Sequence, residues 1–260
     1  MKRFCLSILL LAGILLTGAC SKDITRNPQP EAIVQACLLP RQQVSVRISR
    51  EIPYGSADTL MPLEGLSPVL VQNQIAHPLN YMGKGLYGNP NISLQEHDSC
   101  HLYFQYNDLE VSAHTVIPGR PTGFTCNTDT LKLVPGGSIP QALEFKWNNT
   151  GNDYHMVIVQ MEGAQPWWVR PVNPHQYGPE PLFTSPTKET IAWISNPITF
   201  IPTARYQMLL LRILPEYAVI FNEENNNSLN ITDPPNNIIN GHGVFTGISM
   251  SDALRLDIIN

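Results

Sequence analysis

Three glycines lie close together near the end of the chain, in the segment INGHGVFTGIS (239–249). Glycine-rich loops bring backbone N–H groups close to phosphate, but such loops follow a strand and open a helix, whose N-terminus then faces the anion. Here a loop rich in Asn and Pro comes first and the last strand follows. We therefore predict a structural element, in which Gly241 and Gly243 adopt positive φ while Val244 and Phe245 enter the sheet or core.

Two histidines are candidate metal ligands if the chain brings them together. The segment CHLYFQYNDLEVSAHTV (100–116) reads as a β-hairpin with a two-residue loop at Asn107-Asp108. This register sets His101 directly opposite His114, with Cβ atoms about 5 Å apart, close enough to share a transition-metal ion. The alternative is that both are polar residues of a solvated sheet face.

The same register divides the hairpin into two faces. Residues on opposite strands pair when their numbers sum to 215, as Tyr106 does with Leu109. One face is then apolar and carries Cys100, which we expect to be packed in the core rather than reactive. The predicted core face consists of Leu102, Phe104, Tyr106, Leu109, Val111 and Ala113.

Aromatic side chains in the proline-framed loop QPWWVRPVNPHQYGPEPLF (165–183) are candidate ligand contacts. Rings on rigid loops can stack on sugars or apolar groups. Trp167 and Trp168 face opposite ways if they lie on a strand, so we expect one in the core and the other in a binding surface with His175 and Tyr177. The alternative is that this loop only covers the core.

Three common motifs of catalytic sites do not occur in the sequence. GxSxG, HExxH and P-loop patterns are missing, and the seven histidines are scattered along the chain. We therefore predict a non-enzymatic protein that carries no cofactor.

The first 20 residues predict a lipoprotein signal peptide. Lys2 and Arg3 precede a short apolar run, and small residues then lead into Cys20. We predict that residues 1–19 are removed, that Cys20 becomes the lipidated N-terminus, and that residues 20–30 form a flexible tether. The alternative is an ordinary secretory signal with an incidental cysteine.

Charge and cysteine content limit the partners of the mature chain. Without Lys2 and Arg3, 16 − 2 = 14 basic residues remain against 21 acidic ones, a net charge of −7, which argues against nucleic-acid binding. Cys37, Cys100 and Cys126 allow at most one disulfide, and their spacing does not decide whether one forms.

Short alternating apolar segments separated by Pro- and Gly-rich turns predict an all-β protein of two β-sandwich domains in series. We expect an immunoglobulin- or transthyretin-like domain over 31–117 and a fibronectin type III-like domain over 118–260. At most one short helix is expected, in PEYAVIFNEEN (215–225). Tyr206 is expected to pack under a strand corner with its hydroxyl bonded to nearby backbone; the alternative is an ordinary strand tyrosine.

Several of these segments together resemble one family. They are the lipoprotein cysteine, the tyrosine-rich hairpin, the link VIPGRPTG (116–123), LEFKWNNTGNDYHMVIV (143–159) and DPPNNIINGHGVFTGIS (233–249). Over nearly all of residues 20–259 the chain resembles the DUF4249 family of Bacteroidetes lipoproteins, most specifically in Asn237 to Phe245. The resemblance implies an outer-membrane accessory encoded near TonB-dependent receptors, and it assigns no catalytic residue.

We therefore expect an outer-membrane lipoprotein, periplasmic or surface-exposed, that contacts a TonB-dependent receptor of a nutrient uptake system or helps to present its ligand. The alternative is a surface adhesion or glycan-binding module, which would bind a glycan or peptide through the aromatic 163–186 loop.

Overall fold

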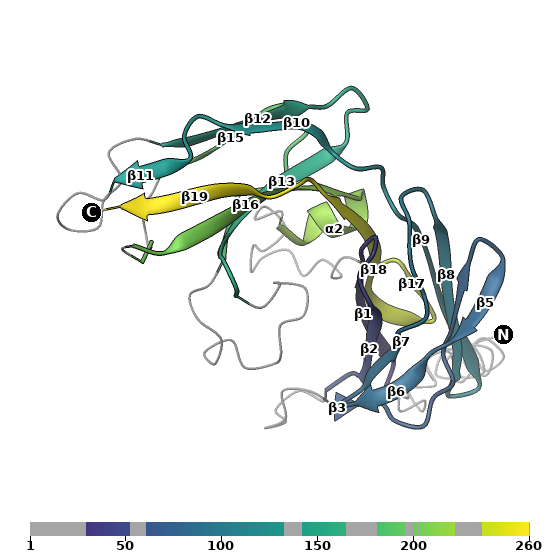
Figure 1. Ribbon diagram of the computed structural model, residues 1–260. Helices are drawn as coiled ribbons and strands as arrows, with labels where there is room; N and C mark the ends of the chain where they lie inside the picture. The colour runs from purple at the N-terminus through teal and green to yellow at the C-terminus, as the bar shows by residue number, and fades with distance from the viewer. Residues whose placement is uncertain are drawn as a thin grey trace, which may run out of the picture. The chain divides into compact units, whose positions relative to one another are not determined.

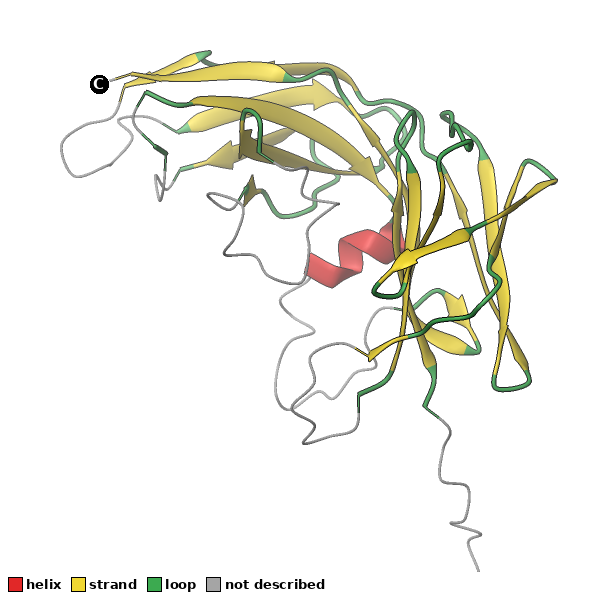
Figure 2. Cartoon of the chain, turned by 60° about the horizontal axis from the view of Figure 1, so that its bottom comes forward, coloured by secondary structure: helices red, strands yellow, loops and turns green. Residues whose placement is uncertain are grey.

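The alternating segments of the sequence form β-strands in the computed structural model (Figure 1). The structure describes residues 30–52, 61–132, 142–164, 181–195, 200–201, 203–221 and 236–259. Within these ranges the chain is nearly all strand and loop, with one short helix (Figure 2). None of the helices in these ranges has the length and apolar character needed to cross a membrane. The signal peptide, most of the tether and Cys20 lie outside the described residues.

The first sandwich packs a five-stranded sheet against strands of a large sheet. The five-stranded sheet has the order β17 (Ile238–Ile239), β9 (Leu109–Val116), β8 (Ser99–Tyr106), β4 (Val69–Gln72) and β5 (Ile75–Pro78). Facing it are β18 (Gly241–Met250), β1 (Ala32–Leu38), β2 (Val44–Arg50), β3 (Met61–Pro62), β7 (Leu86–Asn89) and β6 (Asn80–Gly83). Apolar residues of both sheets, among them Tyr87, Phe104 and Phe245, form the core between them.

The second sandwich packs a three-stranded sheet against the other part of the large sheet. The three strands are β10 (Thr122–Cys126), β12 (Leu143–Asn148) and β15 (Ile191–Ile194). Facing them are β11 (Thr130–Lys132), β19 (Leu254–Ile259), β16 (Arg205–Ile213), β13 (Tyr154–Met161) and β14 (Leu182–Phe183). Leu143, Phe145 and Trp147 are buried between these layers.

The central strand β13 is buried on both faces, which explains its continuous apolar run. Val157 and Val159 belong to the core of the second sandwich, whereas Met156 and Ile158 belong to a third cluster. This cluster also receives Ala218 of helix α2 (Pro215–Ala218), which continues into the 3-10 turn η3 (Val219–Phe221). The short helix therefore forms where the sequence predicted it, and it covers the outer face of the sheet.

Strand β18 joins the two sandwiches into one sheet. Residues 241–247 pair in parallel with β1, and residues 248–250 pair antiparallel with β16. Two sandwiches follow one another along the chain, as expected, but a boundary at residue 117 does not separate their cores. Ile238 and Phe245, from the last part of the chain, lie in the first core. From Glu31 onward the chain is a single compact unit.

The β8–β9 hairpin has the predicted register. Every pair from Ser99↔Val116 to Tyr106↔Leu109 sums to 215, and Asn107 and Asp108 both have positive φ, as a type I′ turn requires. Most of the predicted core face is buried, and Cys100 is fully buried. The expectation is wrong at the hairpin tip, where Leu109 is 54% exposed, because no layer covers the turn.

Tyr206 forms the predicted strand corner. It is 5% exposed at the start of β16, and its hydroxyl accepts a hydrogen bond from the backbone N–H of Ile201 at 2.9 Å. The ring packs edge-on against Phe200, with centroids 4.9 Å apart. Tyr206 therefore closes the corner with both its apolar ring and its polar end.

The INGHGVFTGIS segment is structural, as predicted, but it is a strand rather than a turn. Gly243 has a φ of 112°, whereas Gly241 does not have positive φ and the turn position belongs to Asn240, with a φ of 57°. Gly241 instead allows close approach, because a Cβ there would lie 2.8 Å from the carbonyl oxygen of Ala32. Phe245 is fully buried in the first core, as expected.

The three remaining cysteines are free thiols, and each contacts a different hydrophobic cluster. Burial raises the pKa of Cys37 and of Cys100 to about 12, and it also raises the pKa of Cys126. In the native protein Cys37 and Cys100 therefore carry very little thiolate at pH 8.

We expect iodoacetamide at pH 8 to alkylate Cys37 and Cys100 in the native protein more than about a hundredfold more slowly than in the denatured chain. Mass spectrometry of digested samples over a time course measures this ratio, and guanidinium-denatured protein is the control. Equal native and denatured rates for Cys100 would contradict its placement in the core.

Candidate functional site

A cavity of about 630 Å³ opens beside the link that follows β9. Its walls come from the start of β10, the turn between β12 and β13, and the end of β16. It is lined by Arg120, Pro121, Thr122, Trp147, Asn148, Asn149, Thr150, Gly151, Asp153, His155, Thr190 and Arg212. This volume lies in the range of small-molecule sites, and the lining is mostly polar.

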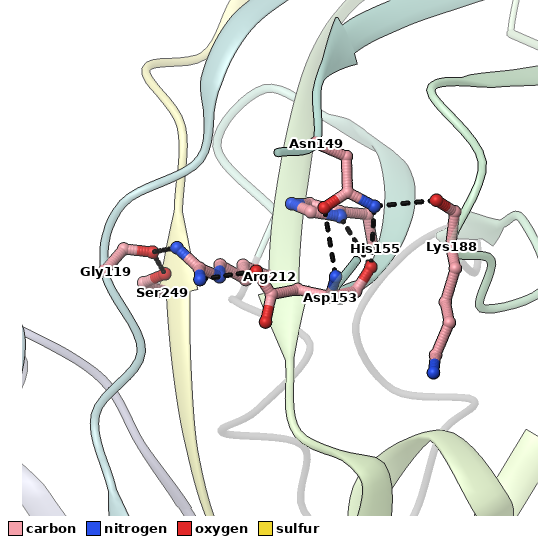
Figure 3. A network of polar contacts seen from close by, with 7 residues as sticks. All are labelled: Gly119, Asn149, Asp153, His155, Lys188, Arg212 and Ser249. Atoms are coloured by element: carbon pink, nitrogen blue, oxygen red, sulfur yellow. Dashed lines mark hydrogen bonds and ion pairs between the residues drawn. The ribbon is translucent and has the colours of Figure 1, made fainter. Parts of the chain in front are cut away.

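Arg212 is the centre of a polar network at this cavity (Figure 3). Its Nη2 donates to Asp153 Oδ2 at 2.5 Å, and its Nη1 donates to the carbonyl oxygen of Gly119 at 3.3 Å. Ser249 on β18 donates to the same carbonyl oxygen at 2.8 Å. The guanidinium is therefore held in one position by the β12–β13 turn and the link.

Asn149 fixes the turn that carries Asp153. Its Oδ1 accepts from the backbone N–H of Asp153 at 3.0 Å, and its Nδ2 donates to the carbonyl oxygens of Asp153 and Lys188 at 2.9 and 2.7 Å (Figure 3). The Lys188 ammonium lies 4.6 Å from the ring centroid of Tyr154, a cation–π contact. The carboxylate of Asp153 is thus positioned before any ligand arrives.

Trp147 and His155 provide the aromatic part of the lining. Their ring centroids are 5.8 Å apart, and both residues are almost fully buried. Burial lowers the pKa of His155, and this effect outweighs the opposing hydrogen bond to the carbonyl oxygen of Asp153. His155 is therefore neutral at pH 7, and it contributes an uncharged ring to the wall of the cavity.

Two buried donors of the lining have no acceptor in the described part of the chain. They are Nε1 of Trp147 and Nε of Arg212. Buried donors are nearly always paired, so each such exception needs an explanation. Neither group can act as an acceptor, and both atoms are buried inside the cavity wall rather than exposed to the cavity.

Arg120 carries the second guanidinium of the cavity. It pairs with Asp252, whose side chain is 91% exposed, while the Arg120 side chain is 39% exposed. An ion pair at the surface contributes little to stability, because water competes for both partners. Arg120 is therefore free to exchange Asp252 for another anion at low cost.

The histidine pair predicted from the hairpin register is present but incomplete as a metal site. His101 faces His114 across β8 and β9. Nε2 of His114 is 3.0 Å from the hydroxyl of Ser99, and the His101 ring lies beside Tyr103 at 5.7 Å. Among the described residues, no group of three metal-ligating side chains comes together there or elsewhere.

The predicted aromatic binding surface lies outside the residues that the structure describes, since it consists of Trp167, Trp168, His175 and Tyr177. Cys20 lies outside them too. The structure assembles its cavity from other residues, whose segments the sequence pattern marked only as a link and as part of the family resemblance. One signal was available in the sequence: Arg212 is a charged residue near the end of an otherwise apolar strand, RYQMLLLRIL.

The fold and this cavity define a class, an all-β protein of two β-sandwiches with a polar cavity lined by two arginines. Among solved structures, domains A168–A170 of titin are similar, with 10% identity, a TM-score of 0.22 and coverage of 71% of this chain and 60% of that one. Three N-terminal domains of the outer capsid protein Hoc of bacteriophage RB49 match with 10% identity, a TM-score of 0.23 and coverage of 88% and 70%. TM-scores of 0.22 and 0.23 are too low to support a fold assignment. The assignment of two β-sandwiches therefore rests on the strand pairing of this structure.

Neither a family model nor a curated protein matches the chain. Membership of the DUF4249 family therefore stays a prediction from the sequence.

Proposed function

We propose that this chain is a non-enzymatic binding protein of the outer membrane, anchored by lipid at Cys20 and accessory to a TonB-dependent receptor in nutrient uptake. The observation that carries the proposal is the lipoprotein signal ending at Cys20, followed within about a dozen residues by a folded all-β unit that starts at Glu31. The resemblance to outer-membrane lipoproteins supports the receptor as the partner.

The cavity supports binding rather than catalysis. Its lining contains no serine or cysteine nucleophile among the described residues, and its single histidine is buried and bonded to a backbone carbonyl. Its two arginines and its fixed turn are features of a recognition site. These groups are sufficient for binding, which requires no nucleophile.

Purification from native membranes in mild detergent tests the proposal. We expect the full-length protein to fractionate with the outer membrane and to co-purify with a stoichiometric β-barrel receptor. A Cys20→Ala variant, which lacks the acceptor thiol, is expected to leave the membrane fraction. Recovery of the lipidated protein as a monomer would overturn the accessory role.

A monomer that binds glycans on an array would instead favour the adhesion alternative. That alternative places the contact in the 163–186 loop. Replacing both Trp167 and Trp168 by alanine is expected to abolish glycan binding if the loop is the platform. Unchanged binding by this double variant would rule the platform out.

A further inference from the structure

We infer that the cavity lined by Arg120, Trp147, Asp153 and Arg212 binds an organic carboxylate. This goes beyond the proposed function, which concerns membrane attachment and a protein partner. The inference rests on the charge of the lining, on the fixed guanidinium of Arg212 and on the exposure of the anion that now pairs with Arg120.

The lining residues carry a net charge of +1. Arg120 and Arg212 contribute +2, Asp153 contributes −1, and His155 is neutral because burial lowers its pKa. Asp252, the present partner of Arg120, is not part of the lining and is almost fully exposed. A monoanion therefore balances the cavity once it replaces Asp252.

The two arginines have different roles in this arrangement. Arg212 is held by Asp153 and by the Gly119 carbonyl, so the N–H groups of its guanidinium that these partners leave open are already oriented, and little side-chain entropy is lost on binding. Arg120 is the mobile partner, and its planar guanidinium can pair with both oxygens of a carboxylate. The entering ligand exchanges one carboxylate partner of Arg120 for another.

The remaining lining favours a carboxylate on a carbon skeleton over inorganic phosphate. The cavity is much larger than one phosphate ion, and Pro121 and Trp147 give it apolar surface. A phosphate dianion would also meet the partly exposed carboxylate of Asp153. Thr122, Thr150 and Thr190 also line the cavity, and a threonine hydroxyl can both donate and accept a hydrogen bond.

Isothermal titration calorimetry on the full-length protein in mild detergent tests the inference. The probes are D-glucuronate, a sugar acid, and N-acetylglycine, which represents a peptide C-terminus. D-glucose and inorganic phosphate are the matched controls. We expect saturable binding of at least one carboxylate and at least tenfold weaker binding of both controls. The preferred probe then distinguishes a sugar acid from a peptide as the natural source.

Two variants assign the binding to this cavity. Arg120→Gln is expected to weaken carboxylate binding by about tenfold or more, because it removes a charge-assisted pair. Asp252→Asn is expected to leave binding unchanged or to tighten it severalfold, because it removes the competing anion. A purely structural role of the ion pair would make both variants behave alike.

The indole N–H of Trp147 provides an independent readout. The chain has four tryptophans, and Trp147→Phe identifies the signal of this one in a proton–nitrogen correlation spectrum. We expect this signal to move as the carboxylate saturates the protein.

Absence of binding by both probes, equal binding of glucose, or an unchanged affinity in Arg120→Gln would each overturn the inference. None of these results would alter co-purification with a receptor, so the two proposals fail separately.

Discussion

Replacing Gly243 by alanine should lower the free energy of unfolding by about 3–5 kcal/mol. Gly243 has a φ of 112°, a conformation that costs an L-residue energy by itself. In addition, a Cβ at this position would overlap the carbonyl oxygen of Val34 and lie 3.0 Å from its carbonyl carbon. These backbone atoms belong to β1, which pairs with β18 at this residue, so they cannot move away without breaking the pairing.

Gly65→Ala is the matched control for this experiment. Gly65 also has positive φ, 72°, but a Cβ there would meet no atom within 4 Å. The control should therefore cost only about 1 kcal/mol, the conformational part alone. Urea unfolding followed by circular dichroism measures both variants. If the two losses of stability are equal, Val34 does not approach Gly243 as closely as the structure shows.

Replacing Asp98 by alanine should lower the free energy of unfolding by about 3 kcal/mol. The Asp98 carboxylate is 7% exposed and accepts three hydrogen bonds. Gln72 Nε2 and Asn73 Nδ2 donate to it at 2.5 and 2.6 Å, and the backbone N–H of Gln95 donates at 2.8 Å. Alanine removes all three bonds and leaves Asn73 Nδ2 and the Gln95 N–H without this acceptor, whereas Gln72 Nε2 keeps its bond to the carbonyl oxygen of Ser93 at 3.1 Å.

The same carboxylate makes stability depend on acid pH. Burial alone would raise the pKa of Asp98, but the hydrogen bonds from Gln95, Asn73 and Gln72 together outweigh it and lower the pKa. Because the folded pKa is below the unfolded one, the stabilisation is fully present above about pH 4 and is lost as the pH falls through the folded pKa.

Asp98→Asn separates the charge from the shape of the side chain. We expect the stability difference between wild type and Asp98→Asn to be constant from pH 8 to about pH 5 and to shrink below about pH 4. Unfolding titrations at a series of pH values measure this difference. A difference that stays constant to pH 2 would contradict the lowered pKa of Asp98.

Local patterns in the sequence determined several elements of this protein. The two-residue loop at Asn107-Asp108 fixed the register of β8 and β9, since a slip of one residue would expose Leu102 and Phe104. A proline and a threonine three to four residues before Tyr206, together with the apolar strand that Tyr206 opens, predicted the bond of its hydroxyl to nearby backbone. In each case the interacting groups are close in sequence, so short-range sterics and alternation decide the outcome.

Tertiary structure alone decided how the distant segments combine. The parallel pairing of β18 with β1 joins residues about 200 positions apart, and no local pattern distinguishes it from other strand partners. The same holds for the cavity, since the link, the β12–β13 turn and β16 bring Arg120, Asp153 and Arg212 together from separate parts of the chain. Alternation shows which face of a strand is buried, but only the packing of the sheets decides which polar residues meet at their edges.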